Sequence, residues 1–524
     1  MSDGYDADVA VIGYGPTGLA ASLTLARYGV SVIALEREES IYPRARAVTV
    51  NDWTMRIMQN LGVGDRMRSA IDPQLALRWL TYDRKEVMRV WHDPSNLGAD
   101  ARFYNLYQPT MEAELRTAAQ ELYGEHLTVL YGADVLKVEQ DVTGVTVTSI
   151  GSDGSTRVIR AKYAIAADGG SSPTREMLGI PLEGDTENEQ WIIIDCHAKR
   201  WWPDRDFLTF WTDRDRPVVD VAVGTGAHRW EIPLRPGETP DDYATEEQVW
   251  PLIHSLGHDE KDVTLHQWAF YRHHVRMAKT WRQGRIFLAG DAAHLMPPWA
   301  GAGMQSGIRD SYDLGWKLAR VLHGRLDEAV LDTYEAERRP NVAFYTHVAV
   351  TNGRVIKGLA TPEEIAEMSA PDPSFQVTPW GPPLSRDPVL ADGWFRGPVA
   401  SDDSAIARMI PQPRVCDPMG LEHLLDDLIG EGFILLGANV DPATVLTPEE
   451  KAGWDALGAR YVTVRPKDAY SEAETDVIDL DHAMLDWMSR YGTTVIALRP
   501  DRFVAADDVH GLAVPDLTRP PARS

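Results

Sequence analysis

The sequence predicts an α/β protein made of more than one unit, and three observations carry this prediction. Apolar runs flank a helical pattern over residues 8–36, as in a β-α-β unit. Tryptophan-rich, alternating strands follow at about 191–281, and another set of strands and helices lies beyond a Pro-, Asp- and Gly-rich stretch at 361–399. The 524 residues suffice for about three domains of roughly 150 residues each.

Composition and charge exclude several classes of protein. Hydrophobic residues make up 44% and charged residues 25%, as in an ordinary globular protein. The net charge of −26 argues against nucleic-acid and membrane partners. The two cysteines, Cys196 and Cys416, form no CxxC pair, so we expect no disulfide, no metal site and a cytoplasmic location. The acidic start of the chain does not resemble a secretory signal.

The first motif is GxGxxG at residues 13–18, between an apolar strand at 8–13 and a helical segment. Its first glycine permits a tight turn, Gly15 lets the backbone approach a pyrophosphate, and Gly18 allows close helix–strand packing. Glu36 ends the next strand, where its carboxylate can bind a ribose diol. These features predict a dinucleotide site but do not decide between NAD(P) and FAD.

The remaining elements are predicted from the spacing of apolar residues. Apolar residues at every second position predict strands, and apolar residues at helical spacing predict helices. The tryptophans at 191, 201, 202, 211 and 230 are expected to form sheet core, with an aromatic pocket as the alternative. We predict a helix at 109–123, strands at 142–150, 157–167 and 286–289, helices at 306–322 and 333–345 (broken at Pro340), and C-terminal strands at 432–436, 459–464 and 493–498.

Two later motifs point to a flavin. RIFLAGDAAH at 285–294, followed by PPWAGAGMQSG at 297–307, resembles the second fingerprint of FAD-dependent aromatic hydroxylases, and DGGSSPTR at 168–175 resembles their DGxxSxxR motif. The chemistry agrees, because an aspartate at a strand end can bind ribityl hydroxyls. A Gly-rich turn before a helix presents N–H groups to the flavin edge. The resemblance implies FAD as the cofactor.

The whole pattern is most similar to the branch containing 3-(3-hydroxyphenyl)propionate and phenol hydroxylases. This resemblance implies an α/β fold with an FAD-binding Rossmann-like domain, an inserted mixed β-sheet substrate domain and a C-terminal thioredoxin-like domain. Without a CxxC, the last domain is expected to serve packing or homodimer contacts. The expected boundaries are 1–75, 106–185 and 282–360 for the FAD-binding domain, 76–105 and 186–281 for the substrate domain, 361–399 for a linker, and 400–524 for the C-terminal domain.

The resemblance also implies the reaction. A phenolic ring, such as that of 3-(3-hydroxyphenyl)propionate, would be hydroxylated ortho or para to its hydroxyl, with NAD(P)H and O2 as co-substrates and a flavin C4a-hydroperoxide as oxygen donor. No second complete dinucleotide fingerprint occurs, which fits a transiently bound nicotinamide. The alternatives are a tailoring hydroxylase of a polycyclic natural product and a non-catalytic flavin-binding protein. Halogenation is disfavoured because HRWEIP at 228–233 has histidine where halogenases have the first tryptophan of WxWxIP.

Candidate site residues follow from these motifs. Alternation along 268–276 puts Tyr271 and His273 on one strand face as candidate catalytic groups, and Asp52 matches a region that reaches toward substrate in phenol hydroxylases. The family usually has asparagine where Gln305 stands, so only the backbone contacts of this position are expected to be kept. The expected cofactor-binding residues are Gly13, Gly15, Pro16, Thr17, Gly18, Glu36, Arg37, Arg44, Arg46, Gln108, Asp168, Asp291, Pro298, Gly301, Gly303, Met304 and Gln305.

Overall fold

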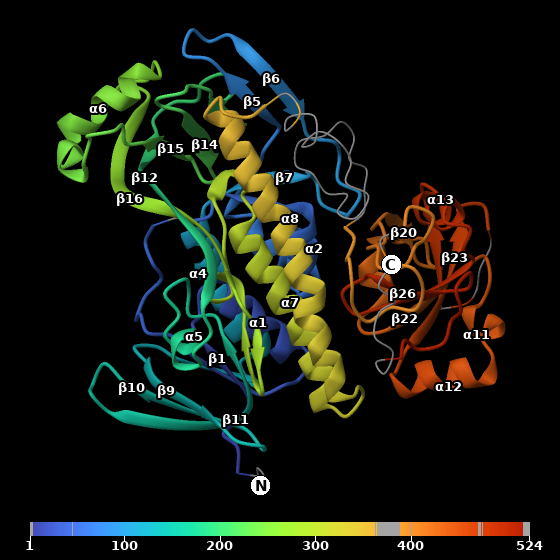
Figure 1. Ribbon diagram of the computed structural model, residues 1–524. Helices are drawn as coiled ribbons and strands as arrows, with labels where there is room; N and C mark the ends of the chain where they lie inside the picture. The colour runs from blue at the N-terminus through green and yellow to red at the C-terminus, as the bar shows by residue number, and fades with distance from the viewer. Residues whose placement is uncertain are drawn as a thin grey trace.

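The structure is a computed structural model that describes residues 4–44, 46–361, 363, 388–399, 401–469, 473 and 475–516. Figure 1 shows two sheets on one side of a pair of long helices, with the C-terminal sheet on the other side. Within the described ranges, no helix combines the length and apolarity needed to cross a bilayer. Most of the predicted linker lies outside the described residues.

The first sheet gathers the three motifs at one edge. Strands β18, β11, β1, β2 and β8 are parallel neighbours, and in register Ile12 lies beside Ala166, which lies beside Leu288. The first motif and the DGxxSxxR motif follow Ile12 and Ala166, and the Gly290-Asp291 turn of the second fingerprint follows Leu288, all at the carboxyl ends of the strands, where open α/β sheets bind ligands. The strands are β1 (Ala7–Ile12), β2 (Val32–Leu35), β8 (Leu127–Leu130), β9 (Asp134–Gln140), β10 (Val145–Ile150), β11 (Thr156–Ala166), β17 (Arg282–Gln283) and β18 (Ile286–Leu288).

Helices cover this sheet and connect it to a small three-stranded sheet. Helix α1 (Pro16–Arg27) packs against α7 (Gly303–Leu322), so the first and last motifs are held side by side. The other elements are α4 (Gln108–Tyr123), α5 (Pro173–Met177), β3 (Thr49–Asn51), α2 (Asp52–Asn60), α3 (Gly64–Met67), β4 (Ile71–Pro73), β7 (Phe103–Leu106), η2 (Gly290–Ala292), η3 (Pro298–Ala300) and η4 (Glu328–Asp332).

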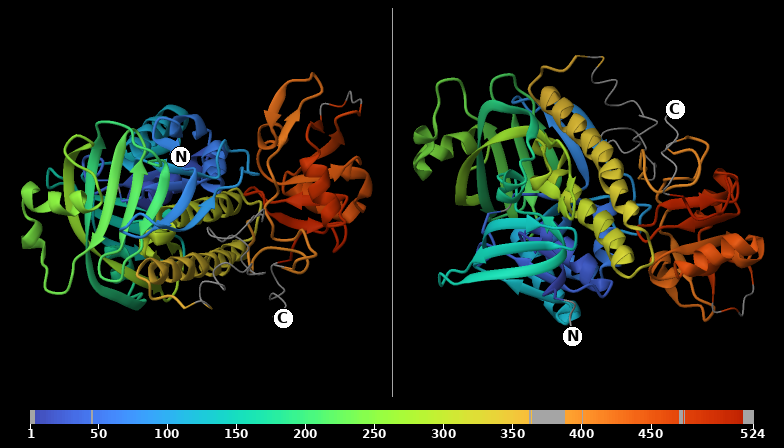
Figure 2. Two further views of the ribbon diagram at one scale, coloured as in Figure 1. Left: turned by 90° about the horizontal axis from the view of Figure 1, so that it is seen from above. Right: turned by 60° about the horizontal axis from the view of Figure 1, so that its bottom comes forward.

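The second sheet has two different faces, visible from above in Figure 2. One face buries Trp211 and Trp230 against α6, which is the expected sheet core, while Trp191 packs on the other face and Trp201 is 65% exposed. The order is β19-β16-β12-β15-β14-β13-β5-β6. The elements are β5 (Ala76–Leu80), β6 (Glu86–Trp91), β12 (Leu182–Ala198), β13 (Phe207–Trp211), β14 (Val218–Val223), β15 (Ala227–Pro233), η1 (Pro240–Tyr243), α6 (Glu246–Ser255), β16 (Val263–Ala278) and β19 (His294–Leu295).

Three local expectations differ from the structure. Residues 103–105, expected in the substrate domain, pair with β3 and β4, because β7 lies between those strands. Strand β12 runs through the expected boundary at 185/186. Helix α8 (Thr333–Ile356) continues through Pro340, whose missing N–H was expected to end it. Buried ion pairs beside the proline, such as Arg338 to Asp310 at 2.9 Å, hold the helix in place.

The C-terminal unit is an α/β unit whose sheet mixes parallel and antiparallel strands. Parallel β22, β23 and β24 are joined by antiparallel β25 and β26, in the order β21-β20-β24-β23-β22-β25-β26. Its elements are β20 (Arg414–Cys416), β21 (Glu422–Leu424), α10 (Leu425–Ile429), β22 (Ile434–Ala438), α11 (Pro442–Val445), α12 (Pro448–Ala456), β23 (Arg460–Pro466), β24 (Asp476–Asp479), α13 (Ala483–Arg490), β25 (Val495–Leu498) and β26 (Val504–Asp507).

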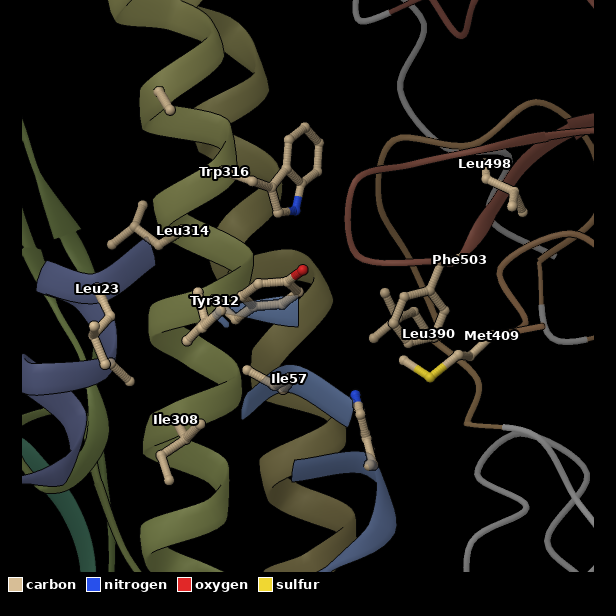
Figure 3. Packing of buried hydrophobic residues seen from close by; sticks show 14 of the residues in the cluster. Leu23, Ile57, Ile308, Tyr312, Leu314, Trp316, Leu390, Met409, Leu498 and Phe503 are labelled. Carbon is tan, nitrogen blue, oxygen red and sulfur yellow. The ribbon is translucent and has the colours of Figure 1, made fainter. Parts of the chain in front are cut away.

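The C-terminal unit packs firmly on α7. Figure 3 shows Tyr312 and Trp316 of α7 on the side of the helix that faces Leu390, Met409 and Phe503. Leu390 belongs to the last part of the predicted linker, so this part is packed in the core.

Buried charges connect the same two parts of the molecule. Arg499 of the C-terminal unit binds Glu337 of α8 at 2.7 Å and Asp313 of α7 at 3.1 Å, and Lys317 also binds both carboxylates at 2.8 Å. All four side chains are at most 6% exposed. Undocking the C-terminal unit would remove Arg499 from both carboxylates and leave Lys317 as their shared partner.

Candidate active site

Two glycines of the first motif leave no room for a side chain. Gly13 has φ +93°, and a Cβ there would lie 2.4 Å from the Ala167 carbonyl oxygen. A Cβ on Gly18 would lie 1.9 Å from the Gly13 oxygen. Helix α1 begins directly after Gly15, and no side chain caps it in the described structure. The N–H groups of its first turn are therefore available to an anionic group such as a pyrophosphate.

A cavity of about 710 Å³ extends from this motif. The Glu36 carboxylate beside it is fixed by the backbone N–H groups of Tyr14 and Glu38, at 2.8 and 2.9 Å. A carboxylate can accept further hydrogen bonds, so Glu36 can still bind a ribose diol. Expected cofactor-binding residues that line this cavity are Gly13, Gly15, Glu36, Arg37, Arg44, Arg46, Asp168, Asp291 and Pro298.

Gln108 shapes the loop that carries the arginines. Its Oε1 accepts hydrogen bonds from the backbone N–H groups of Arg46 (3.0 Å) and Ala47 (2.7 Å), and its Nε2 donates to Glu112 at 2.7 Å. The loop thereby brings Arg46 to the border of both main cavities.

Hydrogen bonds from side chains fix the loop formed by the DGxxSxxR segment. Asp168 accepts hydrogen bonds from the Ser172 hydroxyl and from the Thr174 backbone N–H. Arg175 donates to the carbonyl oxygens of Gly170 (3.1 Å) and Ala292 (3.2 Å). The loop is therefore bound to the second fingerprint, and Asp168 shapes it while bordering the larger cavity.

A buried network of hydrogen bonds and ion pairs, which the sequence did not predict, fixes the turn of the second fingerprint. Asp310 of α7 accepts hydrogen bonds from the Gly290 N–H (3.1 Å) and Arg338 (2.9 Å) and lies 2.6 Å from His294 Nε2. Burial alone would raise the pKa of Asp310, but His294 and Arg338 hold it below its usual value. This ionised carboxylate fixes the turn that carries Asp291, whose own side chain is exposed and borders both cavities.

Gln305 uses its side chain within the protein. Its Oε1 accepts from the Asn51 N–H (2.9 Å) and the Thr54 hydroxyl (3.0 Å), and its Nε2 donates to the Gly301 carbonyl at 2.6 Å. The start of α7 at Gly303 has no side-chain cap in the described structure. Backbone N–H groups of this helix end are left to stabilise negative charge on a ligand.

A second cavity, of about 250 Å³, lies between the motifs and the second sheet. It shares Gly15, Arg46, Asp291 and Pro298 with the larger one. Its lining also includes Pro16, Thr17, Gln108, Gly301, Gly303 and Met304 of the expected cofactor-binding residues. Apolar side chains dominate the rest, namely Val48, Leu77, Phe103, Leu208, Phe210, Val219, Met296 and Trp299, with Thr49, Gln74 and Glu231 as polar groups.

The structure brings together two of the three expected catalytic residues. Tyr271 and His273 share a face of β16, with ring centroids 5.0 Å apart, and both line the larger cavity. Burial lowers the pKa of His273 to about 3, with a smaller contribution from Lys357, so its imidazole is neutral near pH 7. Asp52 differs. It accepts hydrogen bonds from Ser95 and from its neighbour's N–H, and it borders a separate cavity of about 30 Å³.

Three charged residues that the sequence did not predict as site residues surround Tyr271. The Tyr271 hydroxyl donates to Glu231 Oε2 at 3.0 Å, and Arg229 binds Asp195 through two nitrogens at 2.7 and 3.0 Å. Alternation over 227–233 would have placed Arg229 and Glu231 on one face. The sequence did not show that this face borders the cavity.

Comparisons with known proteins identify the family of the chain. Residues 6–348 match the family described as the FAD binding domain, and residues 407–513 match the HcaD C-terminal domain. A 3-(3-hydroxy-phenyl)propionate/3-hydroxycinnamic acid hydroxylase 2 from Burkholderia vietnamiensis is 35% identical, over 96% of this chain and 94% of its own. A hydroxylase of the same name from Mycolicibacterium smegmatis is 30% identical, over 96% and 90%.

Solved structures share the architecture. Aklavinone-11 hydroxylase, in a complex with FAD and aklavinone, has a TM-score of 0.79 at 24% identity and covers 98% of this chain and 97% of its own. The p-nitrophenol 4-monooxygenase of Pseudomonas putida has a TM-score of 0.62 at 25% identity, with 69% and 91% covered. The predicted fold class and the FAD cofactor are confirmed, and the chain belongs to the FAD-dependent aromatic hydroxylases, a family of flavoprotein monooxygenases.

Proposed function

We propose that this enzyme hydroxylates a single-ring phenol with a short acidic side chain, such as 3-(3-hydroxyphenyl)propionate, ortho or para to the hydroxyl, with NAD(P)H and O2. The observation that carries the proposal is the cavity of about 250 Å³ between the flavin motifs and the second sheet. Cavities for drug-sized ligands measure about 300–1,000 Å³. Expected cofactor-binding residues line part of this space, so the part left for a substrate favours one ring over a fused polycycle.

The relatives support this substrate class. Those with 30–35% identity over nearly the whole chain are named for 3-(3-hydroxyphenyl)propionate and 3-hydroxycinnamate, which each carry one phenolic ring and one carboxylate. The likeness to aklavinone-11 hydroxylase is at 24% identity and concerns the fold alone. A polycyclic substrate remains the alternative that the experiment below distinguishes.

We further propose how the chain holds its cofactor. Glu36 binds the adenosine ribose, Asp291 the ribityl chain, and the backbone of residues 303–307 the isoalloxazine. Bound FAD supplies the hydride acceptor and the oxygen-transferring group. The protein excludes water through the apolar lining of the smaller cavity, and the start of α7 stabilises negative charge on the flavin edge.

The test is a substrate panel on the purified holoenzyme. It contains 3-(3-hydroxyphenyl)propionate, 3-hydroxycinnamate, phenol and a tetracyclic phenol, with NADH and NADPH in parallel. We expect the single-ring acids to stimulate NAD(P)H oxidation most and to gain one oxygen atom by mass spectrometry. Hydroxylation of the tetracyclic phenol alone would establish the tailoring alternative. Bound FAD with no stimulation and no product from any phenol would favour a non-catalytic flavin protein.

A further inference from the structure

Glu231 stands out on the sheet face that borders the smaller cavity. It is 3% exposed, and its register neighbours on β14 and β12 are the apolar Val219 and Ile193. The charged groups in the described lining of this cavity are Arg46, Asp291 and Glu231. Asp291 belongs to the cofactor turn, so Glu231 is the carboxylate that the sheet itself presents to a bound ring.

The groups around Glu231 hold it in one orientation. The Tyr271 hydroxyl of β16 reaches across β12 and donates to Oε2 at 3.0 Å. Arg229 Nη1 lies 3.8 Å from Oε1, and Asp195 of β12 binds the other two nitrogens of that guanidinium. Oε2 is therefore engaged by Tyr271, while the contact between Oε1 and Arg229 is longer.

The hydroxylation of a phenol can use a buried carboxylate as a base. A phenol ring becomes more electron-rich when its hydroxyl loses the proton, and a buried site needs a side chain to receive that proton. We propose that Glu231 is the catalytic base for the substrate hydroxyl, with Tyr271 as a positioning residue. The O–H bond of the phenol breaks, the proton joins a Glu231 oxygen, and the electron pair stays on the phenol oxygen. This inference rests on the proposed function.

The electrostatics of the cluster support the proposal. Burial raises the pKa of Glu231, which makes its carboxylate a stronger base toward a phenol, while Arg229 and Tyr271 oppose this rise and favour the ionised form. Burial also raises the pKa of Tyr271 well above 10, so its hydroxyl keeps its proton. Asp195 adds to the rise, and Arg46 and Asp291 are the other charged groups in the cavity lining.

The main test compares wild type with Glu231→Gln. In wild type, hydroxylation should slow at low pH as Glu231 becomes protonated. The glutamine variant should lose the limb set by Glu231 and hydroxylate 3-(3-hydroxyphenyl)propionate about 100-fold more slowly, the size of a general-base contribution. Its residual rate should rise with pH as the phenol ionises in solution.

A substrate with a more acidic hydroxyl distinguishes the loss of a catalytic base from a structural effect of the substitution. A nitro-substituted analogue whose hydroxyl is already ionised at neutral pH needs no base. The ratio of wild-type to Glu231→Gln rates should then fall to within about threefold. Tyr271→Phe keeps the base but removes its donor, so the acidic limb should move to higher pH. Asp220→Asn is the matched control, a buried carboxylate of β14 that contacts His228 and Trp211 on the opposite face; its pH profile should match wild type.

The outcomes distinguish the two proposals. If wild type hydroxylates phenols and Glu231→Gln keeps the wild-type profile, or loses equal activity on both phenols, the base assignment is overturned alone. If wild type hydroxylates no phenol, the proposed function fails and the base assignment falls with it. Thermal melting and flavin content of each variant show whether a loss comes from misfolding.

Discussion

His273 illustrates how burial decides the chemistry of a single side chain. Its ring packs between Trp191 and Trp299, at centroid distances of 5.1 and 4.7 Å, and beside Tyr271. Burial, with Lys357 nearby, lowers its pKa to about 3. A neutral imidazole cannot supply a positive charge to an ionised phenol near pH 7. The alternation that predicted this residue gave its face but not its charge state.

We predict that His273→Asn leaves the pH dependence of hydroxylation unchanged in shape between roughly pH 6 and 9, because the native imidazole does not titrate there. The rate itself is expected to fall less than tenfold. Steady-state rates across this range test the prediction. Disappearance of a limb near neutral pH would show that His273 does titrate in the working enzyme.

At the scale of elements, α7 joins the cofactor motifs to the rest of the chain. Through Gln305 it binds the junction between β3 and α2 and also the Gly301 carbonyl. A family-typical asparagine is one methylene shorter. The departure from the family pattern thus coincides with a side chain that spans both segments.

We predict that Gln305→Ala destabilises the protein by roughly 1–3 kcal/mol, because it leaves the buried Asn51 N–H and Gly301 carbonyl without their partner. Denaturant unfolding measures this change, and flavin fluorescence should show weaker FAD retention. Gln120→Ala, on the exposed side of α4, serves as the control and should change stability by less than about 0.5 kcal/mol. Equal unfolding midpoints for the two variants would disprove the bridging role.

For the whole molecule, buried ion pairs couple the C-terminal unit to the cofactor-binding part. Asp426 binds Arg56 of α2 through two hydrogen bonds of 2.8 Å and lies 3.1 Å from Arg502. Burial alone would raise the pKa of Asp426, but the two guanidinium groups lower it to about 2. A carboxyl with a depressed folded pKa stabilises the protein above its unfolded pKa and loses that contribution in acid.

We predict an acid-sensitive stability that depends on Asp426. Its pH-dependent contribution, about 2 kcal/mol for a fall in pKa from 3.8 to about 2, is present above about pH 4 and lost as the pH falls to about 2. The difference in unfolding free energy between wild type and Asp426→Asn should therefore shrink over this interval. A difference that stays constant from pH 5 to pH 2 would contradict the prediction.

The sequence by itself determined the cofactor, the family and the broad fold. The cofactor-binding turns depend on glycines and on aspartates next to them, and because these residues are neighbours in the sequence a short motif is enough to predict them. Gly13 and Gly18 are examples, since no other residue fits their backbone approach. Only the tertiary structure decided which charged groups share the cavity. Asp52 turns toward Ser95, whereas Glu231 meets Tyr271 from two strands away. Such contacts depend on which sheet face meets which helix, and that information lies in packing between distant segments.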